Sequence, residues 1–86
     1  MTELEAKNIV EMLMPNQKKG MKMVCPRCGN DSLDCDHMML NALSRRADVF
    51  ICSSCGTEEA LNDFFGNDDP ITNWHTVKAV GEVLGL

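Results

Sequence analysis

Four cysteines stand in two matched pairs, and their spacing makes them the part of the sequence best suited to chemistry. Cys25 and Cys28 form one C-x-x-C-G turn, and Cys52 and Cys55 form a second. Two thiolates at this spacing can reach one ion from a single turn, and the glycine that follows frees the backbone so that amides face the sulfurs. Two such turns face to face predict a closed four-sulfur site, which is typical of structural zinc.

Other uses of paired thiols fit this sequence less well. Iron in a rubredoxin-type site would also use two C-x-x-C-G turns, but the chain has no tyrosine and few aromatic residues to build an aromatic-rich core. A disulfide oxidoreductase needs one exposed thiolate, usually at a helix start in a βαβ context. We therefore expect a structural Zn²⁺ ion that folds the domain, and no enzymatic activity.

Three further residues are candidates for metal ligands or reactive groups. These are Cys35, His37 and His75. Because the four-sulfur set is already complete, we interpret Cys35 as a buried thiol and His37 as an ordinary strand histidine. His75 has no second histidine or carboxylate at ligand spacing, which favours a surface or core position.

The elements that must position the cysteines are predicted to form one small α+β domain over residues 1–86. We expect a zinc ribbon over 21–56, that is, a β-hairpin with two zinc knuckles. An N-terminal helix over 2–14 and a helical C-terminal segment over 57–86 flank it. A chain this short buries a modest core, and its fold often needs a bound metal or another cross-link for stability.

The flanking helices are predicted from caps and apolar spacing. Thr2 and Glu5 form a Ser/Thr-x-x-Glu capping box, Pro15 is expected to end the first helix, and residues 16–20 read as a linker. Thr57 is placed to cap a helix through 58–64. After a break at 66–70, Thr72 or Asn73 could cap a final helix.

The ribbon itself is predicted from alternating apolar residues. A short strand is expected over 21–25, a half-buried strand over 33–37, and a strand rich in β-formers over 48–52. Residues 41–46 would then form the hairpin loop and its shoulders.

The charge of the chain is acidic overall but uneven. The net charge is −5. This weakens the hypothesis that the zinc ribbon binds nucleic acid, because phosphate binding depends on clustered cations. Six basic residues nevertheless fall between residues 16 and 56: Lys18, Lys19, Lys22, Arg27, Arg45 and Arg46. No apolar run approaches the roughly 20 residues of a membrane span, and no secretory signal is seen, so we expect a cytoplasmic protein without membrane contact.

The block from Cys25 to Leu61 resembles a family of small zinc-ribbon proteins of bacteria, phages and mobile elements. The matching motifs are CPRCG at 25–29, NALSR at 41–45, DVFIC at 48–52, CG at 55–56 and EEAL at 58–61. The resemblance implies a cytosolic, metal-stabilised accessory protein, and it covers a little under half of the chain.

The function expected from these features is a non-enzymatic protein–protein binding or regulatory module. A hairpin tip does not require the NALSR sequence, so Asn41, Ser44, Arg45 and Arg46 are candidate partner-binding residues. Paired methionines and apolar helix faces also suit a protein partner or a second copy of the chain. The alternative is a nucleic-acid-associated zinc ribbon of transcription-factor type that uses the six basic residues. A weaker third reading is DNA mimicry by the acidic flanks.

Overall fold

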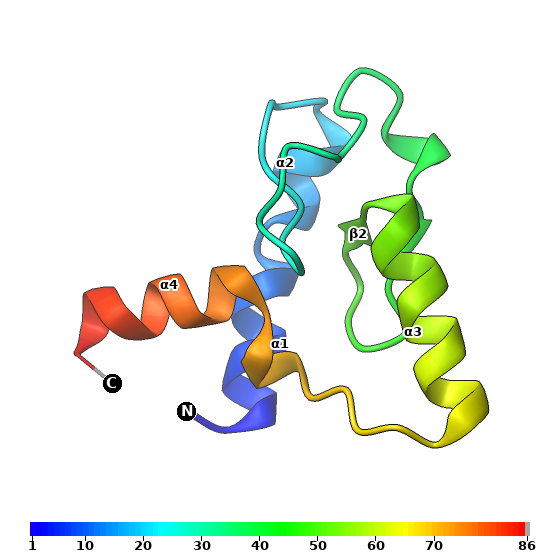
Figure 1. Ribbon diagram of the computed structural model, residues 1–86. Helices are drawn as coiled ribbons and strands as arrows, with labels where there is room; N and C mark the ends of the chain where they lie inside the picture. Colours follow the sequence, from blue (N-terminus) through cyan, green and yellow to red (C-terminus); the bar gives the residue numbers. More distant parts are fainter. Residues whose placement is uncertain (86) are drawn as a thin grey trace.

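The course of the chain is shown in Figure 1, a computed structural model that describes residues 1–85. In order, the elements are α1 (Glu3–Glu11), α2 (Met14–Lys18), the 3₁₀ turn η1 (Met38–Leu40), β1 (Ala42–Leu43), β2 (Phe50–Ile51), α3 (Ser53–Phe65), the 3₁₀ turn η2 (Ile71–Asn73) and α4 (His75–Leu84). The fold is small and α+β, with one antiparallel hairpin among the described residues.

The predicted N-terminal helix is present, but it is broken in two. The Thr2–Glu5 capping box is confirmed, because the Thr2 side chain accepts from the Glu5 amide and Glu5 accepts from the Thr2 amide, each at 3.2 Å. The helix ends at Glu11, and α2 begins at Met14. Pro15 lies in the first turn of α2, where a missing N–H costs nothing. Pro15 therefore opens a second helix, and part of the expected linker is helical.

The strands expected over 21–25 and 33–37 do not form. Residues 21–25 and 33–34 have no regular secondary structure, and residues 35–37 form a bend and a turn. Instead the Cys35 thiol accepts from the Met23 amide at 3.3 Å and lies 3.4 Å from the Met23 carbonyl, so a side chain takes the place of a strand partner. The alternation of apolar and polar residues in these segments correctly predicted that they are partly buried. It wrongly predicted that they pair in a sheet.

The hairpin is shorter and differently placed than predicted. Ala42 pairs with Ile51, Leu43 pairs with Phe50, and the Ser44 amide donates to the Val49 carbonyl at 3.0 Å. The strand predicted over 48–52 is confirmed in part by β2. Ala42 and Leu43 of the NALSR motif form β1 instead of a loop, so the tip of the hairpin lies at residues 44–49.

Helix α3 follows β2 with only Cys52 between them, and Cys52 is its N-cap residue. The prediction placed the start of this helix about one turn later, at Thr57. Gly66 ends the helix in the left-handed region, with a φ of 69°. Consequently Cys55 and Gly56 lie within the first turn of a helix instead of in a free knuckle.

The core lies where α1, β2, η2 and the start of α4 meet the cysteines. It contains Ala6 and Val10 of α1, Val49 and Ile51 around β2, Ile71, Trp74 and Val77, together with Cys25, Cys52 and Cys55. The metal-ligand candidates are therefore part of the same buried cluster as the apolar core. None of the described helices has the length and apolar character needed to cross a lipid bilayer.

Candidate metal centre

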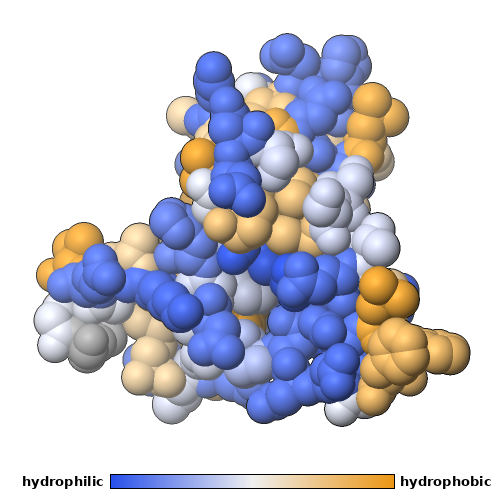
Figure 2. All heavy atoms as spheres, viewed as in Figure 1, coloured by the Kyte–Doolittle hydropathy of each residue, from blue (hydrophilic) through white to orange (hydrophobic). Residues whose placement is uncertain are grey.

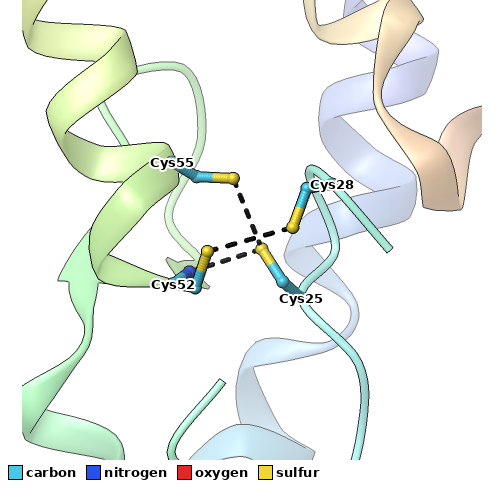
Figure 3. A group of neighbouring side chains, drawn as sticks. All are labelled: Cys25, Cys28, Cys52 and Cys55. Carbon is cyan, nitrogen blue, oxygen red and sulfur yellow. Dashed lines mark hydrogen bonds between the residues drawn. The ribbon is translucent and has the colours of Figure 1, made fainter. Parts of the chain in front are cut away.

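The four predicted thiols converge on one point, as Figure 3 shows. All four Sγ atoms lie within 4.8 Å of one another. The distance between the sulfurs is 3.8 Å from Cys25 to Cys55 and 3.9 Å from Cys28 to Cys52. A tetrahedral ion with metal–sulfur bonds of about 2.3 Å requires sulfur separations of about 3.8 Å, whereas a disulfide requires about 2.0 Å. The group therefore fits a bound metal ion and not a pair of disulfides.

The first knuckle is a tight turn that depends on Gly29. The Gly29 amide donates to the Cys25 carbonyl at 2.8 Å, and the Cys25 amide donates to Asn30 at 3.0 Å. Gly29 has a φ of 77°, a conformation that other residues rarely adopt. A Cβ there would also overlap the ring of His75. Both the turn and the close approach of α4 require glycine at this position.

The second pair is presented by the N-terminus of α3. Cys52 is the N-cap and Cys55 lies in the first turn, where the helix dipole favours negatively charged thiolates. The Cys52 amide also donates to the Cys25 sulfur at 3.3 Å, which links the two pairs directly. Gly56 is helical, and it is required for a different reason from Gly29: a Cβ there would overlap the Cβ of Ala42 in β1.

The cysteines titrate differently in the metal-free chain because their surroundings differ. Burial raises the pKa of Cys25 and of Cys55 above the ordinary thiol value. Burial also acts on Cys52, but hydrogen bonding from Ser32 and from the Cys55 amide outweighs it and lowers the pKa of Cys52 to about 7. A metal ion must therefore displace protons from buried thiols when it binds.

Arg27, inside the first knuckle, ties the knuckle to α3 and to the segment before η2. Its guanidinium lies 3.3 Å from Glu58, 3.7 Å from Glu59 and 3.1 Å from Asp69. Burial on its own lowers the pKa of Arg27, but hydrogen bonding to Cys55 and Glu58 and the charge of Asp69 raise it overall. The arginine is thus a permanent cation beside the thiolate cluster.

Helix α4 is attached to the same knuckle through its first turn. The His75 amide donates to the Arg27 carbonyl and the Thr76 amide donates to the Pro26 carbonyl, each at 3.1 Å. These are amides that have no partner within their own helix. His75 is therefore a packing residue over Gly29, while His37 is exposed beside Asp34, at 3.5 Å. Cys35 lies outside the four-thiol group.

The four candidate partner-binding residues differ in what their side chains do. The Asn41 side chain donates to the Asp34 and Met38 carbonyls at 2.9 and 3.1 Å, and Ser44 donates to Glu59 at 2.9 Å. Arg46 pairs with Asp63 and Asp69. Arg45 is the most open of the four, with 59% of its side chain exposed and Asp63 3.9 Å away.

Sequence reasoning missed Glu59, which organises the hairpin tip. Its carboxylate is buried and accepts from the Ser44 hydroxyl and, at 2.8 Å, from the Arg45 amide. The sequence feature that could have predicted the burial of Glu59 is its position four residues after Cys55. That spacing places Glu59 on the same face of α3 as a metal-ligand candidate. A carboxylate on that face must find donors inside the fold.

Comparisons with known proteins found no matching family model, curated protein or solved structure. The resemblance to small zinc-ribbon proteins therefore stays a prediction drawn from the sequence motifs.

Proposed function

We propose that this chain is a non-enzymatic zinc-ribbon protein that acts as a protein–protein binding or regulatory module in the cytoplasm. The observation that carries the proposal is an exposed apolar and aromatic surface on α3, on the side turned away from the metal. The motifs shared with small zinc-ribbon proteins of bacteria, phages and mobile elements support an accessory role of this kind.

Zinc is the metal that the donor set favours. Four thiolates in a closed tetrahedral arrangement are typical of structural zinc sites and leave no open position for a substrate. In this proposal the ion holds the first knuckle against the end of the hairpin and the start of α3. The metal then supports a binding surface and takes no part in chemistry.

The apolar surface on α3 is formed by Leu61, Phe64 and Phe65, which share one face of the helix. Phe64 is 81% exposed and Phe65 is 67% exposed. The two rings meet edge to face with centroids 5.1 Å apart. Figure 2 shows hydrophobic residues gathered at the right-hand edge of the molecule, over the C-terminal part of α3. Exposed patches of this type mark protein–protein contacts, and aromatic residues dominate their energetics.

A groove between β1 and α3 lies next to this surface. It has a volume of about 390 Å³ and is lined in part by Leu40, Leu43, Arg45 and Ala60. Ala60 precedes Phe64 by one helical turn, so groove and aromatic pair lie along one side of α3. Arg45 is thereby placed in a groove of mixed polar and apolar lining beside the aromatic pair, as an interface arginine would be.

The proposal is tested by affinity capture from bacterial lysate with the metal-loaded chain as bait. Replacing Phe64 and Phe65 by serine should abolish capture of a specific partner and leave metal content and melting temperature unchanged. Val83→Ser on α4 is the matched control, because Val83 is equally exposed but lies elsewhere. Equal capture by all three baits, or no capture by any, would overturn the proposal, and a size measurement would show whether the partner is a second copy.

The nucleic-acid alternative is less well supported by the geometry. Two of the six basic residues, Arg27 and Arg46, are engaged by carboxylates within the fold. Lys18, Lys19, Lys22 and Arg45 are left, on an acidic chain. Binding to nucleic acid would weaken steeply between low and physiological salt, whereas binding through the aromatic surface would not.

A further inference from the structure

A polar cavity lies on the opposite side of α3 from the groove, next to the metal centre. It has a volume of about 480 Å³, and Cys28 and Trp74 are among the residues that line it. Glu58 and Asn62 contribute from α3, and Asp68 and Asp69 contribute from the segment before η2. Hydrophilic residues cover the segment that joins α3 to α4 in the viewed face of the molecule (Figure 2).

Three buried polar atoms without a hydrogen-bond partner belong to residues that line this cavity. They are Arg27 Nε, Asp69 Oδ2 and Trp74 Nε1, and no other buried side-chain atom in residues 1–85 is in this state. The Arg27 side chain is 9% exposed and Trp74 is 2% exposed. The nearest opposite charges lie just beyond hydrogen-bond distance, 3.7 Å from Arg27 Nε and 3.5 Å from Asp69 Oδ2. Arg27 Nε and Trp74 Nε1 are N–H donors, and Asp69 Oδ2 is an acceptor. Buried polar groups are rarely left unpaired, so the cavity is built to receive two acceptors and one donor.

The charges around the cavity select a cation. Three carboxylates line it, those of Glu58, Asp68 and Asp69. Arg27 pairs with Glu58 and Asp69, and Arg46 pairs with Asp69, so the charge left without an ion pair is that of Asp68. Cys28, a ligand candidate that carries negative charge when metal is bound, lines the same space. A phosphate or another anion would meet repulsion here, while a positively charged group would be attracted.

We propose that this cavity binds an arginine side chain of a partner polypeptide. The five donors of a guanidinium can serve Asp69 Oδ2, the exposed Asp68 and the amide oxygen of Asn62 or Asn73 at once. A backbone carbonyl of the same partner accepts from the Trp74 indole N–H. The proposal names a partner chemistry for the binding module above and rests on that function, but it uses a different surface from Phe64 and Phe65.

The first test uses Nα-acetyl-L-arginine N-methylamide as the probe and the full metal-loaded chain as the receptor. Trp74 is the single tryptophan, so its indole N–H gives one resolved signal in a nitrogen–proton NMR spectrum. The probe should shift this signal and the amides of Asp68, Asp69 and Ile71–Asn73 saturably, with a dissociation constant on the order of 1 mM. The citrulline analogue has the same shape without the charge and should bind at least about tenfold more weakly.

The second test is the variant Asp68→Asn, with Asp36→Asn as the matched control. Both aspartates are exposed, and Asp36 lies away from the cavity. Asp68→Asn should weaken arginine binding by about three- to tenfold, and Asp36→Asn should leave it unchanged.

Either of two results would overturn the proposal: an indole signal that does not move, or equal binding of the arginine and citrulline compounds. The variant with Phe64 and Phe65 replaced by serine should still bind the arginine probe. Loss of partner capture with probe binding intact would therefore identify the aromatic surface as the site of the effect.

Discussion

The side-chain amide of Gln17 and the backbone of Phe50 exchange two hydrogen bonds of 2.9 Å each, so a single side chain acts as a strand partner for β2. Gln17 Nε2 donates to the Phe50 carbonyl, and the Phe50 amide donates to Gln17 Oε1. Gln17 is completely buried. On the same edge, the Asp48 amide donates to Glu11 at 2.8 Å. Helices α1 and α2 thereby close the open edge of a two-stranded sheet that would otherwise pair with other chains.

Replacing Gln17 by alanine should therefore destabilise the fold far more than its position near a helix end suggests. The change removes both bonds and leaves a buried amide and carbonyl of Phe50 unpaired, which should lower the free energy of unfolding by about 2–4 kcal/mol. Chemical denaturation of the metal-loaded protein measures this. Asn16→Ala, at the neighbouring position, should cost much less, and equal losses for the two variants would contradict the role assigned to Gln17.

Arg45 and Arg46 are adjacent but should respond differently to substitution. Arg46 pairs with Asp63 and Asp69, and its Nε donates to the Asp69 carbonyl at 3.2 Å. Arg46→Ala should lower the free energy of unfolding by about 1–2 kcal/mol, since a charge network is broken. Arg45→Ala should leave the melting temperature unchanged and weaken partner capture. Similar melting temperatures for both variants would argue against the network.

Gly56 should be intolerant of alanine because of Ala42, and the double variant should show why. A Cβ at Gly56 would overlap the Cβ of Ala42, so Gly56→Ala should cost about 1–3 kcal/mol through overpacking. Adding Ala42→Gly should restore most of this loss in a thermal melt. Gly81→Ala in α4 meets nothing within 4 Å and should stabilise by about 0.5–1 kcal/mol. Failure of the double variant to recover would show that the two residues do not approach as described.

The metal should be required for the fold, with one ion bound per chain. Chelation or Cys28→Ser should abolish the cooperative unfolding transition, because the thiols are part of the core. The purified protein should be colourless with zinc, and a red protein with a visible band would indicate iron instead. Elemental analysis and near-ultraviolet circular dichroism before and after chelation measure these outcomes.

Metal affinity should also rise with pH. Because burial raises the pKa of Cys25 and Cys55, these thiols hold protons at neutral pH in the metal-free chain, and metal binding must release them. Lowering the pH also protonates Cys52, whose pKa is about 7, and so weakens binding further. Cobalt titrations at several pH values measure the slope, and an affinity independent of pH would refute the argument.

The sequence predicted the four-cysteine cluster well, because ligand spacing is a local property. The four cysteines and the Thr2–Glu5 cap were both identified from short-range patterns, and the structure brings both together as expected. Even so, the start of α3 was placed about a turn late. The reason is that the C-x-x-C-G pattern describes two ligands at one turn and does not distinguish a free knuckle from the first turn of a helix.

The contacts that the sequence did not predict join residues distant along the chain. Gln17 was assigned to a linker because its neighbours are polar, and no periodicity marks a side chain that pairs with a strand more than thirty residues away. Glu59 fell within the helix predicted over 58–64 and no partner was predicted for it, yet its carboxylate is buried and accepts from Ser44. The strand expected over 33–37 failed for a related reason, since the thiol of Cys35 satisfied the backbone of Met23. Tertiary partners of this kind can be recognised only once the chain is folded.

The attachment of α4 to carbonyls of Pro26 and Arg27 has a consequence for the lifetime of the protein. Those carbonyls belong to a knuckle that a metal ion bound by the four cysteines would close, so loss of the ion should release the helix as well as the turn. We expect limited proteolysis to cut first within α4 in the metal-depleted chain and to spare α4 in the loaded one. In a cell, turnover of the protein would then follow the supply of metal, and only copies that had acquired their ion would persist.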